Sequence, residues 1–111
     1  MIRRLSAVLD LDLEARLQLV ESVTAEKKDR GAVRRALELL TLLARDVLLL
    51  SQGLAPRLVS GAERDVLERQ AARLRVDELH EYLQALRRTM DRIDRNVDPR
   101  LALEALMVAA P

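Results

Sequence analysis

The stretch ALELLTLLARDVLLL, residues 36–50, decides how the rest of the chain must fold. It predicts a helix that is apolar on almost every side. Its polar positions are Glu38, Thr41, Arg45 and Asp46. A surface helix buries one apolar stripe, whereas a helix that is apolar nearly all round needs neighbours on several sides. We therefore expect a central helix from about Ala32 to Gln52 and Gly53, where glycine supplies the left-handed conformation common just past a helix end.

The composition favours an all-α fold. The chain has 111 residues, of which 50% are hydrophobic, but only one is aromatic, and it has three glycines and three prolines. Aliphatic residues that favour helices therefore predominate, and residues typical of strands and turns are few. We expect a single-domain bundle of about five helices over residues 1–111, with one or two N-terminal helices and a loop in residues 1–30 and the core in residues 31–111.

Charge and cysteine content exclude several classes of protein. The 19 basic and 18 acidic residues are interleaved and their charges nearly cancel, so the sequence shows no basic patch of the kind that binds nucleic acid. The chain has no cysteine, which excludes disulfides and thiolate metal sites. The acidic residues Asp10, Asp12 and Glu14 interrupt the apolar run that a signal peptide would need. The continuous apolar segments are also shorter than the stretch that a bilayer-spanning helix needs. These features predict a cytoplasmic protein without a membrane partner.

The N-terminal segment predicts one amphipathic face with a break in it. Its apolar positions, three or four residues apart, are Leu5, Leu9, Leu13, Leu17 and Val20. Asp10 or Asp12 could end a short first helix and cap a second one that starts near Leu13. The polar run at residues 24–31 predicts a loop.

Two further helices should follow the central one. Residues 54–59 predict a loop, and Ser60 and Glu63 have the spacing of a capping box that would start a surface helix at residues 61–74. The next segment has a 3-4-3-4 seam of Val76, Leu79, Leu83, Leu86, Met90, Ile93 and Val97. Within one domain this pattern favours a straight helix along a bundle over a free coiled coil.

The sharpest predicted boundary is Asp98-Pro99. Proline cannot continue the preceding helix but suits the first position of a new one, with Asp98 as its cap. The last helix, residues 99–109, is apolar on most sides. We expect it either to pack directly against the central helix or to fill a groove on a partner, because so short a helix has little stability alone.

No residue set predicts catalysis, a metal site or a cofactor site. The only histidine, His80, begins a zinc-protease-like ELHEY sequence, but Leu83 and Gln84 stand where the second metal ligand would have to be. The chain has no glycine-rich phosphate loop, and its serines have ordinary helix, cap or loop interpretations. Arginines 87, 88, 92 and 95 alternate with Asp91 and Asp94, which favours a solvated face over direct nucleic-acid contact.

Arg45 and Asp46 stand out because charges within an apolar helix must be paired, lie at its edge or lie at an interface. Adjacent helical residues point about 100° apart, so the two do not simply neutralise each other. We expect one or both to bond to groups near Asn96, at the join of the last two helices.

The end of the chain resembles a known family. Residues 96–111, NVDPRLALEALMVAAP, are similar to the ending of the delta-prime subunit of bacterial DNA polymerase III, and residues 42–53, LLARDVLLLSQG, resemble an Arg-Asp helix of the same C-terminal domain. The resemblance covers Leu37 to the C-terminus. The residues that carry it in one register are Asn96, Pro99, Leu101, Leu103, Glu104 and Leu106.

The resemblance implies a non-catalytic collar domain of a clamp loader, which joins its counterparts on the gamma/tau and delta subunits during DNA replication. On this interpretation Arg45, Asp46, Asn96 and Glu104 shape the fold, and the apolar final helices contribute to subunit contacts. ATPase and lid domains would precede such a collar. The gamma/tau subunit has a similar collar, so the choice of subunit stays open.

Two alternatives remain besides the collar. The first is a helical bundle that forms a homodimer or serves as an adaptor for an unrelated partner. The second is a helical nucleic-acid-binding domain, whose affinity would fall steeply with added salt.

Overall fold

The computed structural model describes residues 2–25 and 30–111, and within them it contains helices and no strand. The elements are α1 (Ile2–Ser6), a short 3-10 helix η1 (Val8–Asp10), α2 (Leu13–Val23), α3 (Arg30–Ser51), α4 (Gly61–Arg73), α5 (Val76–Asp94) and α6 (Pro99–Ala109). The all-α prediction is therefore confirmed. Part of the loop predicted at residues 24–31 lies outside the described residues.

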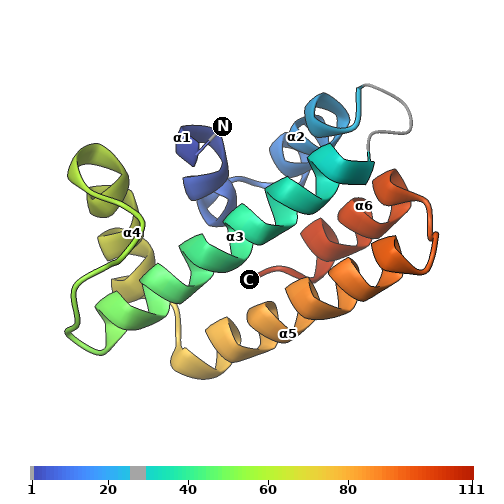
Figure 1. Ribbon diagram of the computed structural model, residues 1–111. Helices are drawn as coiled ribbons and strands as arrows, with labels where there is room; N and C mark the ends of the chain where they lie inside the picture. Colours follow the sequence, from blue (N-terminus) through green and yellow to red (C-terminus); the bar gives the residue numbers. More distant parts are fainter. Residues whose placement is uncertain (1, 26–29) are drawn as a thin grey trace.

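Helix α3 is the axis of the bundle, as its nearly all-apolar surface predicts. Helices α1 and α4 pack on it, and α5 runs alongside it in the opposite direction (Figure 1). Its inward residues include Leu37, Leu43 and Val47, each at most 3% exposed. The helix ends at Ser51, and Gly53 has a φ of +74°, so the predicted glycine stop is also confirmed.

The break near Asp12 forms as predicted, but the apolar face assigned to α2 is only partly correct, because Val20 is buried whereas Leu13 and Leu17 are not. The Asp12 Oδ1 accepts a hydrogen bond from the Ala15 N–H at 2.8 Å and caps α2. Leu13 and Leu17, expected in the core, are 47% and 37% exposed, whereas Arg16 is buried beside Leu19 and Val20. The stripe does not continue because the break at η1 turns α2 relative to α1, and a periodic face is defined only within one continuous helix.

The predicted capping box at the start of α4 does not form. The Ser60 side chain caps no backbone N–H of this helix. Instead, Glu78 forms half of such a box at the start of α5, where its Oε1 accepts from the Arg75 N–H at 3.0 Å. Most of α4 is exposed, as expected of a surface helix, and Leu67 and Gln70 are its fully buried residues.

Helix α5 lies along the bundle, and its buried face is shifted from the predicted seam. Leu79, Leu86 and Ile93 are buried as expected. Tyr82 and Thr89 complete the face, while the ends of the seam, Val76 and Val97, are 39% and 38% exposed. The shift arises because α5 packs on both α3 and α6, so its buried face is set by two neighbours.

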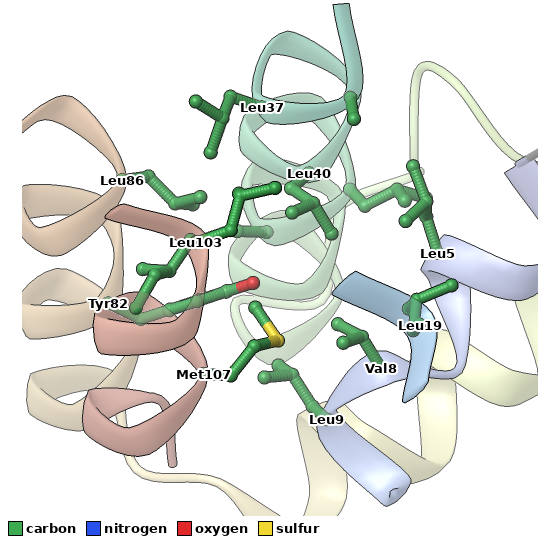
Figure 2. Close-up of a cluster of buried hydrophobic side chains, with 14 of the residues drawn as sticks. Leu5, Val8, Leu9, Leu19, Leu37, Leu40, Tyr82, Leu86, Leu103 and Met107 are labelled. Atoms are coloured by element: carbon green, nitrogen blue, oxygen red, sulfur yellow. The ribbon is translucent and has the colours of Figure 1, made fainter. Parts of the chain in front are cut away.

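Helix α6 begins as the sequence predicts but packs elsewhere. The Asp98 Oδ1 accepts from the Arg100 N–H at 2.9 Å, with Pro99 in the first turn. The nearest helices to α6 are α5 and α2, not α3. The reason is the sharp turn at Asn96, whose φ is +66°, which folds α6 back along α5 (Figure 1). Its side chains still reach the core, where Leu103 and Met107 meet Leu40 of α3 (Figure 2).

Candidate subunit interface

The residues singled out in the sequence do not form one site. Leu103 and Leu106 are 3% and 2% exposed and belong to the core, whereas Leu101 is 62% exposed on the outer side of α6. Glu104 pairs with Arg100 one turn earlier on the same helix, at 2.9 Å. Asn96 and Pro99 shape the turn into α6. Arg45 and Asp46 lie far from them along the bundle, in the half of α3 that contacts the loop to α4.

Asp46 anchors that loop, and the expectation that it bonds near Asn96 is wrong. Its carboxylate is 2% exposed and accepts from three consecutive backbone N–H groups, those of Arg57 (2.8 Å), Leu58 (2.8 Å) and Val59 (3.1 Å). Three donors satisfy a buried carboxylate without a cation. The aspartate thus holds the segment after Pro56 against α3.

Arg45 points into solvent rather than toward Asn96. It is exposed, and within the described residues its side chain has no hydrogen bond or ion pair. It lines a groove of about 440 Å³ between α3 and the α3–α4 loop. The groove residues are Leu42, Arg45, Asp46, Leu48, Leu49, Arg57 and Leu58.

The outer side of α6 is a second apolar surface. Leu101 and Val108 are 62% and 67% exposed, and Ala105 between them is also exposed. Their spacing of four and three residues places them on one face of the helix. The opposite face of α6 is buried, so α6 is apolar on both sides, and none of the described residues covers its outer stripe.

Arg16 fixes the end of this helix and was missed by sequence reasoning. Its Nη1 donates to the Met107 and Ala110 carbonyls at 3.1 and 3.2 Å, and its Nη2 donates to the Pro111 main-chain oxygen at 2.6 Å. The Nε donates to the Val8 carbonyl at 3.1 Å. A guanidinium can serve several carbonyls at once and favours a helix C-terminus, where unpaired carbonyls gather. Arg16 therefore ties α6 to the N-terminal helices.

Arg30 does the same for the end of α5. Its Nη1 donates to the carbonyls of Ile93 and Val97, both at 3.1 Å. The Nη1 of Arg34, one turn later, donates to both carboxylate oxygens of Asp94, at 2.8 and 2.9 Å. Arg16 and Arg30 thus each bind carbonyls at the end of a helix that is distant in the sequence.

A model of the C-terminal region of the delta subunit of DNA polymerase III matches residues 3–110, almost the whole chain. The chain belongs to this family. It is thus a clamp-loader domain, and the matching family is described as delta, whereas the sequence resemblance pointed to the related delta-prime subunit. No curated protein and no solved structure matches the chain.

Tyr82 is a buried polar residue in the core of this clamp-loader domain. Tyr82 lies among the core side chains with its hydroxyl directed inward (Figure 2), and that hydroxyl has no hydrogen-bond partner among residues 2–25 and 30–111. Burial raises the pKa of Tyr82 well above its ordinary value, against a small opposing effect of the Arg16 charge. A phenol that stays neutral and enclosed by leucines is a packing group rather than an acid or base.

The surface of the domain also bears on metal binding and membrane insertion. In the part of the chain that the structure describes, no three His, Asp or Glu side chains are placed to hold a metal ion, and His80 is exposed. No helix there has both the length and the hydropathy to span a bilayer. The two apolar surfaces, the groove beside Arg45 and the outer stripe of α6, are the candidate binding features.

Proposed function

We propose that this domain is the collar of a clamp-loader subunit in the delta-prime position, and that it assembles with gamma/tau and delta subunits without taking part in catalysis. The observation that carries the proposal is the outer stripe of α6, together with membership in a clamp-loader family. A role in bacterial DNA replication would place the domain in the cytoplasm. Direct contact with DNA is not part of the proposal, since acidic and basic residues alternate along the chain.

The stripe is suited to a subunit contact because it is apolar, continuous and held in place. Leu101 and Val108 keep about two thirds of their surface exposed. Burying them would contribute on the order of 1–2 kcal/mol each. The helix cannot easily shift to bury them internally, because its other face fills the core and Arg16 ties down its end. A preformed surface of this kind loses little entropy on binding.

The first experiment mixes the domain with a gamma/tau collar and measures binding by calorimetry and gel filtration. We expect a complex for the unaltered chain and a loss of affinity of at least tenfold for Leu101→Asp. Leu54→Asp is the matched control, because Leu54 is also exposed (56%) but lies in the loop at the other end of α3. Equal binding by both variants would contradict the assignment of the α6 stripe.

A second experiment separates delta-prime from delta. A domain in the delta-prime position should stay bound to gamma/tau when the delta subunit is added, because the two occupy different places in the ring. Displacement by delta would assign the domain to the delta position instead. Tight self-association with no binding to gamma/tau would favour the homodimer alternative.

A further inference from the structure

The groove between α3 and the α3–α4 loop is distant from the stripe proposed above. The loop that forms one wall of the groove lies at the α4 end of the molecule, whereas α6 lies beside α5 toward the other end (Figure 1). Its apolar surface is provided by Leu42 and Leu58, which are 41% and 38% exposed, together with the half-buried Leu48 and Leu49. Leu42, Leu48 and Leu49 belong to α3, and Leu58 faces them from the α3–α4 loop.

The charges around the groove are of one sign. Arg45 and Arg57 are both exposed, and neither guanidinium has a carboxylate partner among the described residues. The one carboxylate that lines the groove, Asp46, is 2% exposed and fully engaged by three backbone N–H groups. The groove therefore offers two positive charges beside an apolar surface, and its only negative charge faces the loop backbone.

The groove is also built in advance. Its second wall is the segment at Arg57 and Leu58, which Asp46 ties directly to α3. A volume of about 440 Å³ lies within the roughly 300–1,000 Å³ usual for binding clefts. The neighbouring hollow, between the end of α3 and α4, lacks this charge pattern because its Arg64 and Glu68 pair with each other at 3.0 Å.

We propose that this groove binds an amphipathic segment of a neighbouring clamp-loader subunit, whose leucine-like side chains enter the groove and whose carboxylates pair with Arg45 and Arg57. The inference rests on the proposed collar function and gives the collar a second contact surface. The recognition is that of a helix laid into an apolar groove, with charge complementarity fixing its direction. Nucleic acid fits less well, because the groove has only two cations and no aromatic side chain for base stacking.

The test uses the full 111-residue chain in a reconstituted mixture with gamma/tau and delta subunits. The variants are Arg45→Glu and Arg57→Glu, with Arg88→Glu, an exposed arginine on α5, as the matched control. We expect each groove variant to weaken assembly at least tenfold and the control to leave it unchanged. Added salt should weaken the unaltered contact and have less effect on the variants. Circular dichroism checks that all chains remain folded.

A photo-crosslinking amino acid in place of Leu42 identifies the occupant. We expect crosslinks to a segment of gamma/tau or delta in which apolar residues recur every three or four positions and Asp or Glu residues lie beside them. Crosslinks between copies of this chain, or to added DNA, would overturn the inference in favour of those partners. Assembly that depends on Leu101 but not on Arg45, Arg57 or this crosslink would also overturn it, while leaving the α6 proposal intact. Dependence on neither surface would refute both.

Discussion

Replacing Arg16 with methionine removes the guanidinium that joins α6 to η1. Met retains most of the apolar stem but none of the donors. The hydrogen bonds to Val8 and Met107 are buried, and bonds to a charged donor contribute about 1.5–3 kcal/mol each. The bonds to Ala110 and Pro111 are partly exposed, so water can replace them. After an allowance for the cost of burying the charge itself, we expect a loss of about 2–4 kcal/mol.

The assay is urea denaturation. If all variants share the same dependence of the free energy of unfolding on urea concentration, the change in the midpoint gives the change in that free energy. Hydrogen exchange adds a local readout, because the last turn of α6 should lose protection in the variant before the rest of the bundle does. Arg16→Lys should recover only part of the loss, since one ammonium cannot reach carbonyls on both sides. Arg69→Met, at an exposed site on α4, is the control. A change below about 0.5 kcal/mol for Arg16→Met would refute the argument.

The remaining predictions concern the core, the loop and the buried phenol. Leu43→Ala should destabilise the domain by about 2–5 kcal/mol in the same urea assay, because the side chain is 3% exposed, while Leu54→Ala should have little effect. Asp46→Ala leaves three N–H groups unpaired and should cost about 2–4 kcal/mol, with faster exchange at residues 57–59 as the local sign. Tyr82→Phe should be neutral or stabilising by up to about 1 kcal/mol, because the hydroxyl it removes has no partner. Tyr82 is the only tyrosine, so ultraviolet titration should detect no ionisation of the folded chain near pH 10, and stability should fall above about that pH because only the unfolded phenol releases its proton.

Local signals in the sequence predicted the starts and stops of several helices. These signals act on backbone groups only a few residues away, so each helix boundary lies next to the residue that causes it. Examples are Asp12, Asp98 with Pro99, and Gly53. The central position of α3 was predictable for a similar reason, because a helix without a polar face has to be enclosed. Ser60 shows the limit of such arguments, since the loop before α4 is held by Asp46, more than ten residues away.

The candidate site was predicted less well than the fold. Leu101, Leu103 and Leu106 look alike in the sequence, but only Leu101 faces outward. The distinction depends on which neighbours cover α6, and these are α5 and α2 rather than the central helix. The groove beside Arg45 could not be predicted, because one of its walls is a loop whose position depends on a long-range bond.

The sequence by itself determined that this protein is helical and which residues start and end several of its helices. Only the tertiary structure decided which side of each helix is covered and which arginines are structural. Arg16 makes this plain, because its partners on α6 lie 91 to 95 residues away along the chain. Periodicity reports the faces of one helix, but burial depends on the packing of several, and that packing is settled by contacts between residues far apart in sequence.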